Sequence, residues 1–205
     1  MSSADVPRLG ILVSGRGSNL QAIIGAVRAG QLDAEIAAVI ADRAGAAALQ
    51  RARDAGVDTA VLLARDYPDR DACDRAFVSA LRERQVDLVC LAGFMRIVGS
   101  PLLDAFPHRI VNIHPSLLPA FPGLNAQQQA LDHGVRITGA TVHLVTPALD
   151  DGPIVAQAAV PVFDGDTVET LSARILVEEH RLYVEALRVV LQGRWTVSGR
   201  RFLRT

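Results

Sequence analysis

"LGILVSGRGSNLQAIIGAVRAG", residues 9–30, joins a short apolar run to a stretch with the spacing of an amphipathic helix. The apolar run 9–15 predicts a buried strand. Residues 18–30 predict a helix with Ser18 as its N-cap and Gly30 at its end. The glycine-rich loop between them therefore predicts a strand, a loop and a helix in succession, as in a parallel α/β sheet.

The same alternation continues towards residue 100. Further strands are predicted at 34–42, 58–64 and 86–93, and further helices at 45–56 and 69–85. Short, continuous runs of Val, Ile and Leu that alternate with helices indicate a parallel sheet covered on both faces. We therefore expect residues 1–100 to form a doubly wound half that binds a nucleotide phosphate.

The pattern changes in residues 101–205. Strands are predicted at 109–115, 137–146 and 152–162, and helices at 124–134 and 166–193, the last capped by Asp166 or Thr167. The last two strands are too close in sequence for a crossover helix, so they should pair antiparallel. No linker interrupts residues 1–205. The sequence thus predicts one α/β domain, doubly wound, with a mostly parallel sheet, an antiparallel C-terminal hairpin and a long closing helix.

Composition excludes several classes of function. The net charge of -1 gives no reason to expect nucleic acid or an anionic membrane as a partner. Cys73 and Cys90 are too few for a disulfide framework. No signal peptide and no apolar run of membrane-spanning length are visible, which favours a cytoplasmic protein. All 21 basic residues are arginine, so lysine Schiff-base chemistry and the lysine of a phosphate-binding P-loop are excluded.

The first loop, "SGRGSNLQ" (14–21), is a candidate phosphate site. In an open parallel sheet it lies at the carboxyl edge, where ligands bind. Gly15 and Gly17 allow close backbone approach, and Ser18 and Asn19 open a helix whose positive end favours phosphate. The loop lacks the third glycine of the dinucleotide fingerprint. A monophosphate site is predicted, with a simple capped turn as the alternative.

The segment "NIHPSLLPAFPG", residues 112–123, places polar groups at the end of a strand. Because strand side chains alternate, Asn112 and His114 should point to the same face. An amide donor beside an imidazole suits a developing oxyanion and a proton transfer. A structural histidine is the alternative. The prolines that follow should form a rim.

The turn "LDDGP" (149–153) can bring Asp150 over the neighbouring sheet end. A carboxylate there would stabilise an imidazolium and raise the pKa of the histidine; a plain turn is the alternative. His143 is interpreted as a satisfied, partly buried strand residue, and His108 and His133 as surface residues. No cluster has metal-ligand spacing, so no metal is expected.

Five segments together resemble the phosphoribosylglycinamide formyltransferase family, in the family's order and over nearly the whole chain. They are "LVSGRGSNLQAII" (12–24), "LAGFMRI" (91–97), "NIHPSLLPAFPG" (112–123), "GATVHLV" (139–145) and "LDDGPIVAQ" (149–157). The resemblance implies formyl transfer from 10-formyltetrahydrofolate to glycinamide ribonucleotide in purine synthesis. It also implies a Rossmann-like fold with these two small molecules as partners, no metal, and a monomer or homodimer. On this resemblance, residues 101–205 would form the folate-binding and catalytic half.

The resemblance also implies residue roles. His114 would be the catalytic imidazole, Asn112 would polarise the formyl oxygen and contact folate, and Asp150 would support His114. Glycinamide ribonucleotide would contact Gly17, Ser18, Asn19 and Glu179. Folate would contact Arg70, Met95, Arg96, Ile97, Val98, Leu149 and Asp150.

Two positions depart from the family pattern. Leu176 replaces a polar residue near the phosphate, and "LNAQQQAL" (124–131) replaces a loop segment that contains histidine.

Three other functions are alternatives to formyl transfer to glycinamide ribonucleotide. A formyltetrahydrofolate hydrolase would carry an N-terminal regulatory domain, and a methionyl-tRNA formyltransferase would carry an RNA-binding C-terminal domain and more positive charge. A non-catalytic nucleotide-binding module would have no use for Asn112, His114 and Asp150 together.

Overall fold

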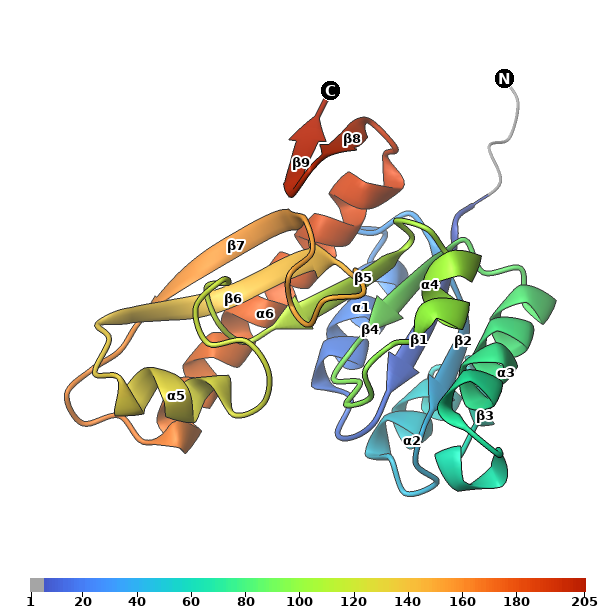
Figure 1. Cartoon of the computed structure of the whole chain (residues 1–205), viewed down its shortest axis with the longest axis horizontal. Helices are drawn as coiled ribbons and strands as arrows, with labels where there is room; N and C mark the ends of the chain where they lie inside the picture. Colours follow the sequence, from blue (N-terminus) through green and yellow to red (C-terminus); the bar gives the residue numbers. More distant parts are fainter. Residues whose placement is uncertain (1–5) are drawn as a thin grey trace. The chain divides into compact units, whose positions relative to one another are not determined.

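The computed structural model describes residues 6–205, which form two compact units, one ending at Val111 and the other comprising Asn112–Thr205. The division falls inside the strand β5 (Ile110–His114), which contributes its last three residues to the second unit. The sequence pattern had placed the change near residue 100. Figure 1 labels the helices and strands of both units.

The first unit contains a parallel sheet in the order β3-β2-β1-β4. Its strands are β1 (Arg8–Val13), β2 (Glu35–Ala41), β3 (Thr59–Val61) and β4 (Leu88–Leu91). Its helices are α1 (Ser18–Arg28), α2 (Ala47–Asp54), α3 (Arg70–Glu83) and α4 (Ser100–Ala105), with a 3₁₀ turn η1 (Ala64–Asp66). Successive residues of β1 and of β4 are buried, so both faces of this sheet are covered, as predicted.

Three details of the first unit differ from the sequence-based expectation. Ser18 is not the N-cap of α1: that position is taken by Gly17 in a left-handed conformation, and Ser18 is the first helical residue. The predicted strand 58–64 is shorter, because the chain turns into η1 after Leu63. Helix α4 was missed, since six residues are too few to show a helical period.

The second unit contains strands in the order β5-β6-β7-β9-β8. These are β6 (Ile137–Leu144), β7 (Ile154–Pro161), β8 (Trp195–Ser198) and β9 (Arg201–Arg204), and the helices are α5 (Ala126–Asp132) and α6 (Val168–Leu191). The predicted antiparallel pairing of β6 with β7 is confirmed. The α/β class and the long C-terminal helix are confirmed as well.

Helix α6 packs against β6 and β7 and provides much of the core of the second unit (Figure 1). Tyr183 and Leu187 on this helix are completely buried. Of the two predicted caps, Thr167 is the N-cap: its hydroxyl accepts the backbone N–H of Thr170, and Thr170 returns the contact in a capping box.

The hairpin of β8 and β9 was not predicted. Trp195 stacks on Phe202 with ring centroids 4.9 Å apart. The strand β9 pairs in parallel with β7 where Arg201 lies opposite Ile154. Within the described range 6–205, no helix has the length and apolar character that crossing a membrane would require.

Candidate active site

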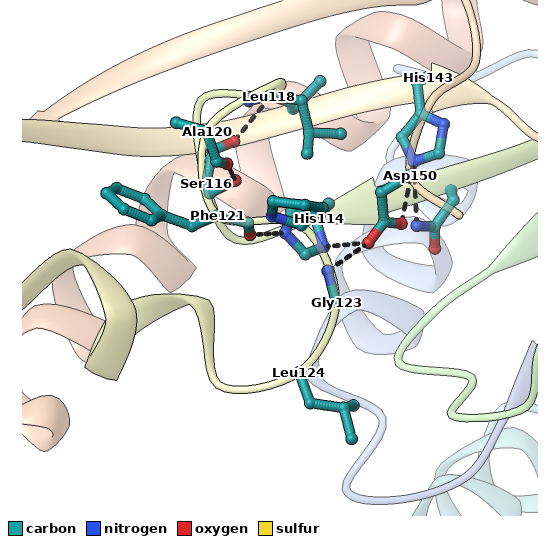
Figure 2. A network of polar contacts seen from close by, with 12 residues as sticks. His114, Ser116, Leu118, Ala120, Phe121, Gly123, Leu124, His143 and Asp150 are labelled. Atoms are coloured by element: carbon teal, nitrogen blue, oxygen red, sulfur yellow. Dashed lines mark hydrogen bonds and ion pairs between the residues drawn. The ribbon is translucent and has the colours of Figure 1, made fainter. Parts of the chain in front are cut away.

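An imidazole and a carboxylate face each other in the second unit. Nδ1 of His114, the last residue of β5, lies 3.4 Å from Oδ2 of Asp150, which belongs to the turn between β6 and β7 (Figure 2). Both side chains are more than nine-tenths buried. The other carboxylate oxygen, Oδ1, lies 3.7 Å from Nε2 of His143 on β6. The turn "LDDGP" therefore does bring Asp150 to the end of β5.

The second ring nitrogen of His114 has a different neighbour. Nε2 lies 2.9 Å from the carbonyl oxygen of Phe121. Because a carbonyl oxygen only accepts hydrogen bonds, Nε2 carries a hydrogen, and the lone pair of the neutral ring is on Nδ1, beside Asp150. His114 can thus hold one proton at Nε2 and take up a second at Nδ1.

The pKa of His114 lies below its ordinary value, because burial disfavours the charged ring more than its neighbours favour it. Phe121 O and Asp150 act in the opposite direction, and His143 adds to the lowering. The expectation of a raised pKa is therefore wrong in its net direction, although Asp150 has the expected sign. At neutral pH the ring is therefore neutral, with a hydrogen on Nε2, and its Nδ1 can accept a proton.

Asp150 is held as a carboxylate. Burial raises its pKa, but the neighbouring ring of His143, the backbone N–H of Gly123 and the ring of His114 together lower it. The N–H of Gly123 donates to Oδ2 at 2.8 Å. The backbone of Asp150 has φ +49, a left-handed conformation that aspartate tolerates better than most residues.

The proline-containing loop after His114 is fixed to β6 and β7. The hydroxyl of Thr141 donates to the carbonyl of Ser116 at 2.7 Å and accepts the N–H of Leu118 at 3.0 Å. The amide of Gln157 donates to the carbonyl of Leu118 at 2.9 Å. The Leu118–Pro119 peptide is cis. Prolines have no N–H, so side chains from the neighbouring strands anchor the loop that delivers Phe121 O and Gly123 N to the site.

His143 was interpreted from the sequence as a satisfied buried residue, and it is buried at 2% exposure. It nevertheless belongs to the same network: its Nε2 lies 3.2 Å from Nδ2 of Asn112, and its Nδ1 lies 3.0 Å from the carbonyl oxygen of Leu144. Asn112 and His114 thus share one group of neighbours, as same-face strand positions should. The signal in the sequence was a lone polar ring within the apolar stretch "GATVHLV".

In the first unit, the first loop is shaped by Gly17. Its φ of +75 and its closeness to Ala48 leave no room for a side chain, since a Cβ at this position would lie 2.6 Å from Cβ of Ala48. The guanidinium of Arg51 donates to the carbonyl of Arg16 at 2.9 Å, which brings positive charge to the loop. Gly17, the N-cap of α1, has no side chain that could cap the first turn, which suits an anion site at a helix N-terminus.

The segment 95–98 is also in the first unit and is bound to the first loop. The N–H of Met95 donates to Oγ of Ser14 at 2.8 Å. Arg70 at the start of α3 donates from Nη2 to the carbonyl of Ile97 at 2.8 Å. Two of the residues expected to contact folate, Arg70 and Ile97, therefore touch each other.

The side chain of Asp74, on α3, also fixes the segment 95–98. One of its carboxylate oxygens lies 3.0 Å from the guanidinium of Arg96, and the other accepts the N–H of Gly99 at 2.7 Å. The side chain of Arg96 also lies over the ring of Phe77. Arg96 thus uses its side chain for the fold, which leaves only its main chain for a ligand. Met95 and Ile97 are exposed, while Val98 is buried.

Of the remaining predicted residues, all but His108 lie in the second unit. Glu179 is a buried carboxylate on α6, one turn after Leu176. Leu149, next to Asp150, is 55% exposed. His108 and His133 are exposed, as expected. In residues 6–205 no group of three or more His, Cys, Asp or Glu side chains is arranged to hold a metal ion.

Comparison with known proteins defines the family to which the chain belongs. Residues 7–187 match the formyl transferase family, and the chain belongs to it. Within this family it is similar to phosphoribosylglycinamide formyltransferases, as its motifs had indicated. It is 47% identical over 193 residues to the phosphoribosylglycinamide formyltransferase of Mycobacterium tuberculosis, covering 94% of this chain and 89% of the relative.

Solved structures agree. The glycinamide ribonucleotide transformylase 1 of Symbiobacterium toebii is 55% identical, with a TM-score of 0.97 over 98% of this chain and 95% of the other. A formyltetrahydrofolate deformylase of Pseudomonas syringae is 27% identical, with a TM-score of 0.92 over 100% of this chain and 67% of the other. The bovine trifunctional purine biosynthetic protein adenosine-3 is 47% identical over 186 residues, which are 91% of this chain but only 18% of that protein.

Proposed function

We propose that the chain transfers the formyl group of 10-formyltetrahydrofolate to the amine of N1-(5-phosphoribosyl)glycinamide. The products are formylglycinamide ribonucleotide and tetrahydrofolate, a step of purine biosynthesis. The observation that carries the proposal is the buried His114–Asp150 pair at 3.4 Å, with Asn112 on the same strand. Likeness to named formyltransferases over nine-tenths of the chain supports this substrate pair.

In the proposed reaction the glycinamide nitrogen attacks the formyl carbon directly. A C–N bond forms, the carbonyl oxygen becomes an oxyanion, and the amine gives up a proton. Nδ1 of neutral His114 accepts that proton, and Asp150 and Phe121 O stabilise the resulting imidazolium. Asn112 donates to the oxyanion.

Collapse of the tetrahedral intermediate then breaks the bond between the formyl carbon and N10 of the folate. N10 receives a proton from the His114 imidazolium, directly or through a water bound to Asp150. The number of protons is conserved, and no covalent formyl-enzyme is needed. The role of the protein is to orient two substrates and to stabilise charge where it develops.

Each candidate binding residue has a proposed role. Gly17, Ser18 and Asn19 bind the phosphate through backbone N–H groups at the start of α1, and Glu179 binds the ribose. The main chain of residues 95–98 binds the pterin, Leu149 and Asp150 close that pocket, and Arg70 lies near the folate tail. We further propose that the protein acts in the cytoplasm, where its two buried thiols would remain reduced.

A steady-state assay distinguishes this function from the alternatives. The purified chain should consume 10-formyltetrahydrofolate only when glycinamide ribonucleotide is present, with one formylated nucleotide formed per tetrahydrofolate. Release of formate at the same rate without the nucleotide would indicate a deformylase instead. Absence of turnover with both substrates, together with nucleotide binding, would indicate a non-catalytic nucleotide-binding module.

A further inference from the structure

His143 occupies a position that determines how Asn112 can act. Both of its ring nitrogens have defined neighbours, and the ring is 2% exposed. Nδ1 lies 3.0 Å from the carbonyl oxygen of Leu144, which can only accept, so Nδ1 carries the hydrogen. In the neutral ring, Nε2 is then restricted to accepting.

The group that Nε2 faces at hydrogen-bonding distance is the side-chain amide of Asn112. Nδ2 of Asn112 lies 3.2 Å from Nε2 and can donate to it. If the amide were rotated by 180°, its carbonyl oxygen would face the lone pair of Nε2, with acceptor against acceptor. The neutral Nδ1–H form of His143 therefore selects one orientation of the Asn112 amide. That orientation leaves the second hydrogen on Nδ2 for another acceptor.

The competing neighbour of Nε2 is Asp150. Its Oδ1 lies 3.7 Å away, beyond the usual length of a hydrogen bond. A protonated His143 would turn Nε2 into a donor, which would favour Asp150 and repel the amino group of Asn112. The shorter contact to Asn112 fits the neutral ring.

Close packing at Gly152 helps to hold the carbonyl group of Leu144 in place beside His143. The carbonyl of Leu144, which holds Nδ1 of His143, passes so close to Gly152 that a Cβ there would lie 1.7 Å from its oxygen. A bulge between Val142 and His143 occurs at the same point of the β6–β7 pairing. A side chain at position 152 would have to displace the acceptor that fixes the tautomer.

We propose that His143 is a positioning residue: as the Nδ1–H tautomer it fixes the Asn112 amide so that its second N–H is available for the oxyanion. The proposal rests on the proposed function, because it assigns Asn112 to the formyl oxygen. His143 itself exchanges no proton with either substrate. Its effect on the rate is transmitted through Asn112.

Nitrogen-15 NMR of the histidine rings tests the tautomer in the unmodified protein. The Nδ1 signal of His143 should be that of a protonated nitrogen and the Nε2 signal that of an unprotonated one at neutral pH. Gly152→Ala should weaken that preference, because it displaces the carbonyl of Leu144. A protonated Nε2 in the unmodified protein would overturn the proposal.

A double-mutant cycle tests the transmission through Asn112. His143→Leu removes the acceptor and should lower kcat about tenfold or more, up to the roughly 10²–10³-fold loss of one oxyanion donor. His143→Gln, which retains an acceptor oxygen, should recover part of the rate. In an Asn112→Ala background, His143→Leu should cause no further loss, since the amide it positions is gone.

The outcomes separate the two hypotheses. Equal losses from His143→Leu with and without Asn112 would overturn the positioning role while leaving the proposed function intact. A slow Asn112→Ala variant combined with a fully active His143→Leu variant would do the same. Normal turnover by Asn112→Ala would remove the oxyanion role of Asn112 on which the positioning role depends, whereas absence of formyl transfer by the unmodified protein would contradict the proposed function. Thermal unfolding of each variant shows whether its fold is retained, and the NMR measurement needs no variant at all.

Discussion

Oδ2 of Asp150 is shared between Nδ1 of His114, at 3.4 Å, and the backbone N–H of Gly123, at 2.8 Å. The carboxylate is therefore fixed by the loop that follows His114 as well as by the turn that carries it. Two opposing effects meet in His114: burial lowers the pKa of the ring, and Asp150 raises it. Removing the carboxylate should remove one of the effects that raise the pKa of His114.

Asp150→Asn should therefore lower the pKa of His114 still further. Asparagine has nearly the same size and tolerates the left-handed φ of +49, so the turn should be retained. If neutral His114 is the proton acceptor, the acidic limb of the kcat profile should move to lower pH with that pKa. The plateau rate should fall, because the imidazolium that forms during transfer loses its counter-charge. NMR titration of His114 and pH–rate profiles measure both effects; an unchanged titration would show that Asp150 does not act on the ring.

His114→Asn should lower kcat by roughly 10²–10⁴-fold, since it removes the imidazole that accepts the proton of the amine and returns it to N10. His108→Asn is the matched control. His108 is exposed and has φ +55, which asparagine accommodates. The control should retain normal turnover and stability. Comparable activity in both variants would exclude His114 from the chemistry.

Gly17→Ala should weaken binding of glycinamide ribonucleotide, because its Cβ would meet the backbone and side chain of Ala48 and its φ of +75 disfavours alanine. Gly25→Ala, on helix α1 outside this loop, has open space around its Cβ and should bind the nucleotide normally. Calorimetry with the nucleotide and with its dephosphorylated riboside measures the difference. Equal affinity of the unmodified protein for both ligands would remove the phosphate assignment.

Gln129→Ala should impair catalysis although the residue lies outside the set of acid–base groups. Its amide donates to the carbonyls of Leu124 at 2.9 Å and Pro122 at 3.3 Å, on either side of Gly123. Loss of these contacts should loosen the loop that holds Asp150, and we expect a severalfold fall in kcat. Gln128→Ala is the control, because Gln128 bonds only to Asp132 on its own helix among the described contacts. Equal rates for both variants would show that the loop needs no such support.

Thr167→Ala should destabilise the second unit by about 1 kcal/mol, the usual effect of losing a helix N-cap. Thr167 and Thr170 form a reciprocal capping box at the start of the 24-residue helix α6. Thr167→Ser keeps the hydroxyl and should lose much less. Denaturant unfolding with equal slopes for the three proteins would make the free energies comparable. If Thr167→Ala is as stable as the unmodified chain, the box contributes nothing measurable.

The longer elements were predictable because their signals are local. Alternating strands and helices in the first unit follow from uninterrupted Val, Ile and Leu runs, and α6 follows from its long helical period. Helix α4 and the hairpin of β8 and β9 were missed, because six- and four-residue elements carry little periodicity. The cap of α1 was assigned to Ser18 by residue preference, whereas the close approach of Ala48 requires Gly17 at that position.

The candidate site also has a part that could be predicted from the sequence and a part that could not. Strand alternation placed Asn112 and His114 together, and the short turn brought Asp150 near them. The participation of His143 depends on the register of β5 and β6, which no local pattern reveals. The net pKa direction of His114 could not be predicted either. Its sign depends on how much of the ring is buried, which is a property of the packed structure.

The terminal hairpin has a practical consequence. Arg200, between β8 and β9, forms an ion pair with Asp151, the immediate neighbour of Asp150, and Arg201 pairs with Ile154 just beyond the same turn. Arg200 and Arg201 lie outside residues 7–187, the part of the chain that matches the family. A shortened chain ending at Leu191 would therefore lose this support of the Asp150 turn. Rates measured on such a protein would describe a changed candidate site.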